Sequence, residues 1–557
     1  MAILAPKPTV IIDYKTYFGV PPPEDRISFI KDISKKNVLY EITALNYRLK
    51  PKEKIHIDIS LNTQLKELKY FTQSKELFQK YFKTLKGLIK SEKDYPIIFN
   101  RQCCLFAIEE IINSDGIEDI EDFEMARIEV WEAILKYLLA VNYAITEIRT
   151  EDKEDRIGFE YLNPKLLPLN ELMIETDLIY TPYRGYWLFA FFLKHDKYKE
   201  EINKFFKAKY GIEPNKFIYE VLSLYMSNNN ENPEHNFFYL VEEGSQDLFD
   251  KLSIEVFNTE MHKLISIRKS PFIKVGKHKF LISDNSFLLE KTYNQFINDF
   301  WFDWIKLIKN EAGKLVFNIH EYRSAFGYFF EEYIAGILAN SFEKYNYSHL
   351  SMFDDLKIKS SDGEIEITDI YFRNTNKIIL GQVKSGSIYD KEKFGGSVES
   401  LYKNNRDKFF ENFGVDQLIE SLNKMDKYIQ EVDIKFPKGH VYKVFPVIIV
   451  NDKVFQTPLM ADIFNTRFKE LLPSFKVKNA IVYPLSLIHV SDLERLETFL
   501  NEKPKEIWEI LKYNHRNKKF IPPFYFTVNQ KIKGRKYPKR VTKLFKELIT
   551  LYGPNKN

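Results

Sequence analysis

Between residues 321 and 500 the spacing of apolar residues switches repeatedly between the helical period of three or four and the strand period of two. The predicted helices and strands, in chain order, are 325–342, 364–372, 377–385, 415–432, 441–450, 480–490 and 492–500. Strands and helices mixed in this order predict a sheet flanked by helices, which is an α/β domain. Ser491 and Glu494 have the S-x-x-E spacing of a capping box and predict where the last helix starts.

The other parts of the chain have a different pattern. A length of 557 residues is enough for three or four domains, so we expect an α+β and α/β multidomain protein. Apolar residues at helical spacing in 124–145 and 215–226 predict a mainly helical N-terminal region. The predicted parts are a small β-containing segment (1–60, from the runs 9–14 and 54–60), a mainly helical region (61–265), a connector with a β-hairpin at Gly276-Lys277 and a helix (266–320), the α/β domain (321–500) and a basic C-terminal extension (501–557).

Composition excludes some classes of protein. With 44% hydrophobic and 29% charged residues the chain is expected to fold rather than remain disordered. The net charge of +4 is no global nucleic-acid signature, so any such contact must come from a local basic face. The N-terminus lacks signal-peptide features, and the most apolar stretch (185–193) is too short to span a bilayer. We therefore expect a soluble, cytoplasmic protein without a membrane partner.

The cysteines and histidines give no sign of a disulfide framework or a zinc site. Cys103 and Cys104 are adjacent, where a bridge would be strained, so two small buried residues in a reducing compartment are expected. None of the ten histidines has the spacing of a zinc hydrolase, and no phosphate-binding P-loop is present.

Polar residues follow apolar ones at the end of the predicted strand 377–385. Gln382 and Lys384 share one face, and a lysine that ends an apolar strand is better placed beside a phosphate than in a core. Asp369 lies in the preceding predicted strand, so in a tight hairpin the polar ends meet only if the strands bend or are offset. Where they converge, Asp369, the Gln382 amide and the Val383 carbonyl offer oxygen ligands to Mg²⁺. Lys384 could then steady an attacking hydroxide. A surface lysine and a turn aspartate are the alternatives.

An acidic residue of the predicted helix 325–342 is a further candidate. At 100° per residue Glu331 falls at the edge of the apolar stripe, whereas Glu332 falls nearly opposite, in solvent. Glu331 could therefore face a site at the helix–sheet boundary and bind a metal-bound water. Glu366, in the same predicted strand as Asp369, faces the other way by parity unless a bulge intervenes.

These motifs together resemble the PD-(D/E)XK nuclease superfamily, most closely its Mrr-type and RecB-type branches, in which Gln can replace the second acidic residue. The matching segments are "GYFFEEYI", "TDIYF", "GQVKSG" and "VDQL", with Gly327, Phe330, Glu331, Asp369, Gln382 and Lys384 at the motif positions and Gln417 as a loose match on the following helix. The resemblance implies a restriction-endonuclease-like domain with a mixed central sheet and a Mg²⁺ or Mn²⁺ cofactor. Gln382 departs from the acidic pattern, which puts metal affinity and metal number in question.

Two groups of residues are candidates for contact with nucleic acid. On the predicted helix 415–432, Gln417, Ser421 and Lys424 lie on one strip that could face a nucleic-acid backbone. A basic segment near the C-terminus surrounds Tyr537, and a solvated charged loop is the alternative explanation for it. Its basic residues are Lys531, Lys533, Arg535, Lys536, Lys539 and Arg540.

The function expected from these features is metal-dependent endonuclease activity on DNA. Asp369, Gln382 and Val383 would hold the metal with help from Glu331, and Lys384 would position the hydroxide. By analogy of architecture the helical region would act as the sensor of a bacterial antiphage-defence or restriction-type effector. The alternatives are an RNase with the same site, or a non-catalytic nucleic-acid-binding or scaffold protein with a degenerate nuclease fold. A homo-oligomer and an accessory defence partner remain open.

Overall fold

The chain divides into two compact units, which is coarser than the five predicted parts. In this computed structural model the N-terminal unit contains the described residues from 10 to 309 and the chain end from Leu548, and the sheet unit contains those from 310 to 547. The structure describes residues 10–49, 60–88, 96–114, 128–147, 168–174, 176–227, 237–254, 264–360, 363–386, 406–436, 439–475, 479–517, 520–534 and 536–553.

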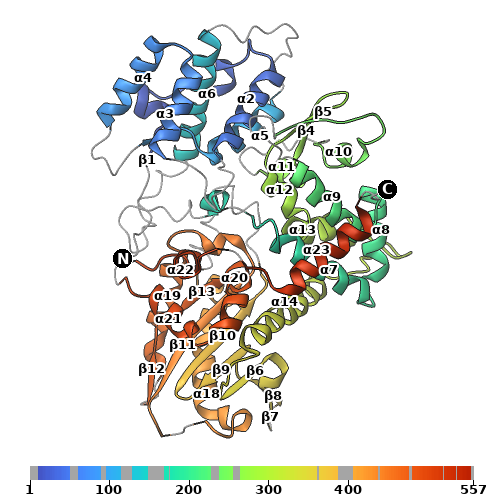
Figure 1. Cartoon of the computed structure of the whole chain (residues 1–557), viewed down its shortest axis with the longest axis vertical. Coiled ribbons are helices and arrows are strands. Elements are labelled where there is room, and N and C mark those ends of the chain that lie inside the picture. Colours follow the sequence, from blue (N-terminus) through green and yellow to red (C-terminus); the bar gives the residue numbers. More distant parts are fainter. Residues whose placement is uncertain are drawn as a thin grey trace. The chain divides into compact units, whose positions relative to one another are not determined.

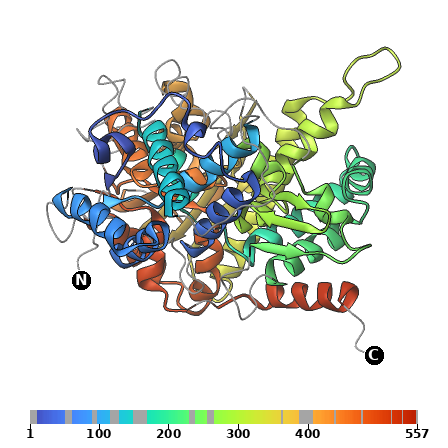
Figure 2. The ribbon, with the colours of Figure 1, turned by 90° about the horizontal axis from the view of Figure 1, so that it is seen from above.

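The N-terminal unit is mainly helical, as the apolar spacing predicts, and helices α2, α3, α5 and α6 lie side by side in it (Figure 1 and Figure 2). Within residues 10–49 the strand content is limited to β1, and helices make up most of the segment. The predicted run 54–60 lies outside the described residues except for Ser60. The helices are α1 (Tyr14–Phe18), α2 (Lys35–Arg48), α3 (Leu61–Thr72), α4 (Lys75–Leu88), α5 (Arg101–Asn113), α6 (Ile128–Glu147), α7 (Tyr180–Lys194), α8 (Lys199–Tyr210), α9 (Pro214–Ser227), α10 (Asp247–Lys251), α11 (Ile265–Lys269), α12 (Asn285–Glu290) and α13 (Asn294–Asp303).

Short strands complete this unit. β1 (Val10–Ile11) pairs in parallel with β2 (Pro96–Ile97). β4 (Phe272–Gly276) and β5 (Lys279–Ile282) form the predicted hairpin, and β3 (Phe238–Leu240) pairs with β5. Cys103 and Cys104 of α5 are both buried and free, as expected. In the part of the chain that the structure describes, no helix combines the length and hydropathy needed to cross a bilayer.

The sheet unit contains the mixed sheet. Its strand order is β12-β11-β10-β9-β6, and β13 also pairs with β11. β9 pairs antiparallel with both β6 and β10, whereas β11 pairs in parallel with β10, β12 and β13. The strands are β6 (His349–Met352), β9 (Ile370–Asn374), β10 (Lys377–Lys384), β11 (Tyr442–Val450), β12 (Ala480–Val482) and β13 (Ser486–His489).

Helices cover both faces of this sheet, and side chains alternate between the faces along each strand. On one face Phe372 of β9 stacks on Phe342 of α14 at 4.4 Å and on Trp508 of α21 at 5.6 Å. On the other face Tyr371 and Arg373 bond to Asp433, which follows α18. The helices of the sheet unit are α14 (Ile319–Phe342), α17 (Arg406–Asn412), α18 (Val415–Val432), α19 (Met460–Leu471), α20 (Val490–Glu502), α21 (Glu506–Asn514), α22 (Phe524–Lys531) and the part of α23 (Lys539–Tyr552) that precedes Leu548.

The central strands are apolar almost throughout because both of their faces are covered. Pro446 lies inside β11, although proline has no N–H for a ladder bond. β12 pairs with β11 only as far as Val444, and β13 starts opposite Val447. Pro446 therefore lies beside the interval between these two neighbouring strands. The side chain of Asn465 bonds to both backbone groups of Leu485 in that interval, so the break in the ladder leaves these groups satisfied.

Three predicted elements differ from the structure. The predicted strand 480–490 is two strands, β12 and β13, which pair with different parts of β11. The predicted strand 364–372 is two strands, because β8 (Gly363–Glu366) pairs with β7 (Lys357–Ser360) in a separate ribbon and only β9 joins the sheet. The capping box does not form at Ser491, since α20 begins at Val490 with His489 as its N-cap. Glu494 is buried and accepts a hydrogen bond from Tyr333 of α14 instead.

Candidate functional site

The break between β8 and β9 decides whether the polar strand ends meet. Asp369 directly precedes β9, and in an antiparallel pair the start of one strand lies beside the end of the other. Ile370 is opposite Gly381, and the Asp369 N–H donates to the Gly381 carbonyl at 3.2 Å. Asp369 therefore lies beside the end of β10, and no bend of a longer strand is needed to bring it there.

The Asp369 carboxylate is held by two groups of β10. The Val383 N–H donates to Asp369 Oδ2 at 2.6 Å, and Lys384 Nζ lies 4.0 Å from the same oxygen. The Thr368 hydroxyl donates to the Gly381 carbonyl at 2.7 Å and fixes the backbone just before the carboxylate. Burial raises the pKa of Asp369 to about 6, against the opposing effects of the Lys384 charge and the Val383 N–H.

Gln382 is oriented by α18. Its Nε2 donates to Ser421 Oγ at 3.1 Å, and the Ser421 hydroxyl donates to the Gln417 carbonyl at 2.8 Å. Because the Ser421 hydrogen is already used, this oxygen can only accept from Gln382, which fixes the nitrogen end of the amide toward α18. The amide oxygen is then the end that a cation could use.

Glu331 comes to the site from α14. It is half-buried and Glu332 is exposed, as the helical pattern predicts. Burial, followed by the negative charges of Asp369 and Glu366, raises the pKa of Glu331 to about 7. One turn earlier, a Cβ at Gly327 would lie 3.7 Å from Ser385 Oγ, so this part of α14 faces the end of β10. The structure thus brings the four predicted residues Glu331, Asp369, Gln382 and Lys384 to one region.

Glu366 is a further acidic residue, which strand parity predicts to face the other way from Asp369 unless a bulge intervenes. Parity relates the two side chains only along one continuous strand, and the strand predicted at 364–372 is interrupted before Asp369. The negative charge of Glu366 raises the pKa of both Asp369 and Glu331, so it lies within electrostatic range of the site. The apolar alternation continues through Ile365 and Ile367, so no local signal in the sequence separates β8 from β9.

The donor set suits a hydrated cation better than a fully caged one. Among the described residues, no three His, Cys, Asp or Glu side chains are grouped so that they could hold a metal ion. The site offers the Asp369 carboxylate, the Gln382 amide and the Val383 carbonyl, with Glu331 nearby. Mg²⁺ keeps several waters and commonly binds through one or two carboxylates plus substrate phosphates, so this set fits it.

The predicted strip on α18 does not form one exposed face. Gln417 is exposed, but Ser421 is buried against Gln382. Lys424 lies 3.9 Å from Glu420, one turn earlier on the same helix. Gln417 contributes to the site through its backbone carbonyl rather than through its side chain.

Several residues of the basic C-terminal segment have partners within the sheet unit. Arg540 Nε donates to Glu497 Oε1 at 3.0 Å, and Lys536 Nζ donates to Glu502 at 3.1 Å, so both fasten the segment to α20. Lys531 lies 4.7 Å from the centre of the Tyr513 ring. Lys533 and Lys539 are exposed, and Arg535 lies outside the described residues.

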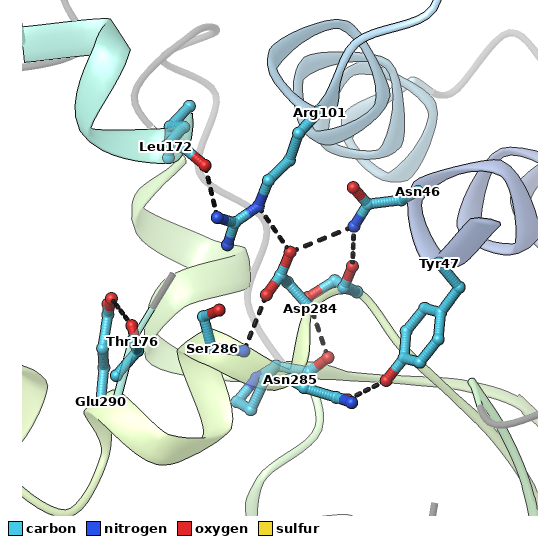
Figure 3. Close-up of polar contacts among 11 residues, drawn as sticks. Asn46, Tyr47, Arg101, Leu172, Thr176, Asp284, Asn285, Ser286 and Glu290 are labelled. Atoms are coloured by element: carbon cyan, nitrogen blue, oxygen red, sulfur yellow. Dashed lines mark hydrogen bonds and ion pairs between the residues drawn. The ribbon is translucent and has the colours of Figure 1, made fainter. Parts of the chain in front are cut away.

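A second polar cluster is buried in the N-terminal unit (Figure 3). Arg101 of α5 pairs with Asp284 at 2.8 Å, with side chains only 1% and 0% exposed. Asn46 of α2 donates to Asp284 at 3.2 Å, and the Ser286 N–H donates to it at 2.7 Å. Nearby, Arg268 pairs with Glu290 at 3.0 Å. Arg268 also lies 3.5 Å from the buried Glu171, so both arginines are engaged by carboxylates of the same unit, which suits a structural connection between its segments better than a ligand site.

Comparisons with protein-family models, with curated proteins and with solved structures found no match for this chain.

Proposed function

We propose that this chain is a divalent-metal-dependent nuclease that hydrolyses phosphodiester bonds of DNA at the end of β10. The observation that carries the proposal is the 4.0 Å approach of Lys384 Nζ to Asp369 Oδ2, beside the half-buried Glu331. The resemblance to PD-(D/E)XK nucleases implies a site with a carboxylate, an amide and an ammonium group close together. The mixed sheet with helices on both faces also supports this reading.

Each residue has a role that its contacts support. Asp369, the Gln382 amide oxygen and the Val383 carbonyl would hold Mg²⁺ or Mn²⁺, which would polarise the phosphate and lower the pKa of bound water. The Val383 N–H and Ser421 keep the first two ligands oriented. The Lys384 ammonium would steady the attacking hydroxide and the charge that develops on the phosphate. Glu331, with a pKa near neutrality, could accept a proton from the attacking water.

The remaining unit suggests a biological role by analogy. A nuclease joined to a large helical unit resembles bacterial restriction or abortive-infection effectors, in which such a unit senses the trigger. We therefore propose a defence effector in the cytoplasm, with DNA as the substrate.

Plasmid cleavage tests the catalytic proposal. Supercoiled DNA is incubated with the wild type, Lys384→Ala and Lys377→Ala, each with Mg²⁺, Mn²⁺ or EDTA. Lys377 is the matched control because it lies at the other end of β10. We expect metal-dependent nicking that Lys384→Ala reduces about 100-fold or more. Lys377→Ala should remain close to wild type.

A non-catalytic nucleic-acid-binding or scaffold protein with a degenerate nuclease fold is the second candidate. It is favoured by the neutral Gln382 and by the lack of a three-ligand group among the described residues. Binding of DNA or RNA without cleavage under any metal would select this alternative. Cleavage of RNA but not DNA would keep the site and change the substrate.

A further inference from the structure

Gly414, the residue before α18, lies against the side chain of Lys384. Its φ of +83° is in the left-handed region that residues with a Cβ rarely adopt. A Cβ at this position would lie 2.6 Å from Lys384 Cε, 3.3 Å from Gln382 Cβ and 3.5 Å from Lys384 Cγ. The stem of the lysine therefore runs through the space that a side chain at position 414 would occupy.

The backbone around Gly414 is fixed from both sides. Its N–H donates to the Glu411 carbonyl at 3.1 Å, and its own carbonyl accepts from the Leu418 N–H at 3.0 Å. The ring of the preceding Phe413 packs 5.0 Å from Phe409 and 4.6 Å from Phe455. Any added atom at position 414 would therefore displace the lysine more easily than the corner between α17 and α18.

We propose that Gly414 is a positioning residue for Lys384, an inference whose catalytic meaning rests on the proposed nuclease function. Lysine has four rotatable side-chain bonds, and Lys384 is 18% exposed, so contacts along its stem decide where the ammonium lies. The surface of Gly414 restricts the stem to a path that leaves Nζ 4.0 Å from Asp369 Oδ2. A side chain at position 414 would move the ammonium away from that carboxylate.

A double-mutant cycle tests this contact without any assay of activity. Thermal midpoints are measured for the wild type, Gly414→Ala, Lys384→Ala and the double variant of the full chain. Gly313→Ala is the matched control, because Gly313 has a φ of +73° and an added Cβ would meet no atom within 4 Å. We expect Gly414→Ala to lower the midpoint more than Gly313→Ala does, and most of this excess to disappear when Lys384 is alanine, the remainder reflecting the 3.3 Å approach to Gln382 Cβ. The same loss in both backgrounds would overturn the inference.

Cleavage kinetics test the catalytic consequence. Gly414→Ala should lower kcat about 10- to 100-fold with little change in KM, because a displaced catalytic group slows chemistry more than binding. Gly313→Ala should leave kcat unchanged. A kcat of wild-type size in a folded Gly414→Ala variant would contradict the positioning role. If Gly414→Ala does not fold, Gly414→Asn replaces it, since asparagine tolerates a positive φ but still carries a Cβ. If the wild type itself cleaves nothing, the proposed function fails and the thermal cycle still decides the contact.

Discussion

Asp492, in the first turn of α20, is a buried carboxylate with few hydrogen-bond partners. Its side chain is 1% exposed, and Gln456 Nε2 donates to Oδ2 at 3.3 Å. Oδ1 has no hydrogen-bond partner among the described residues. Burial raises the pKa of Asp492 to about 7, so the protonated form is favoured in the folded state over much of the acidic range.

The raised pKa makes the free energy of unfolding depend on pH, and the substitution Asp492→Asn should remove this contribution. The pKa of Asp492 in the folded state lies above its unfolded value of about 3.9. The contribution of this carboxyl to stability is therefore complete below about pH 3.9 and is lost as pH rises through about 7. We expect the variant to exceed the wild type in free energy of unfolding by about 1 to 3 kcal/mol at about pH 8, and by less at about pH 5. Urea denaturation at both pH values measures the difference. Equal differences at the two pH values would contradict the raised pKa.

At the scale of secondary-structure elements, a buried ion pair connects helices of the N-terminal unit. Arg101 begins α5, and Asp284 is the N-cap of α12, where it also accepts from Asn46 of α2. Arg101 in addition donates to the Leu172 carbonyl in the 3₁₀ turn Pro168–Met173. Segments far apart in the sequence thus share one set of charged hydrogen bonds (Figure 3).

Removing one partner of this pair should be costly. Arg101→Met leaves the Asp284 charge buried without its cation, and we expect a loss of about 3 to 5 kcal/mol in the free energy of unfolding. The control is Lys277→Ala, which removes an ion pair with Glu243 whose side chains are 79% and 81% exposed. It should change stability by less than about 1 kcal/mol. Chemical denaturation of both variants provides the comparison, and similar losses would refute the role of burial.

The helix and strand assignments of the sheet unit show how far sequence periodicity reaches. It predicted α14, α18, β10 and β11, because each has a long apolar pattern of one period. It did not predict the division between β8 and β9, because the apolar alternation continues through both. Which strand a residue pairs with depends on partners distant in the chain, such as β10 for β9 and β7 for β8.

At the scale of the whole molecule, the two compact units each bury their own apolar residues. A chain of this kind is not expected to unfold in one two-state step. Scanning calorimetry of the full chain should therefore resolve at least two transitions. Arg101→Met should lower the midpoint of one transition, and Asp492→Asn should shift the other. A single transition that both variants shift equally would contradict the separate unfolding of the two units.

Local features of the site can be read from the amino-acid sequence alone. The period of two placed Gln382 and Lys384 on one face, and the helical period separated the half-buried Glu331 from the exposed Glu332. These features follow from the geometry of a single element, which repeats at a fixed angle or alternation regardless of what packs against it.

How these elements meet depends on their packing in the folded chain. The pairing of Ile370 with Gly381 brought Asp369 to the end of β10, and the approach of α18 brought Gly414 against Lys384. The reason is physical: the face of a residue is set by its own backbone, whereas strand register and helix docking are set by the packing of segments that the chain separates by tens of residues.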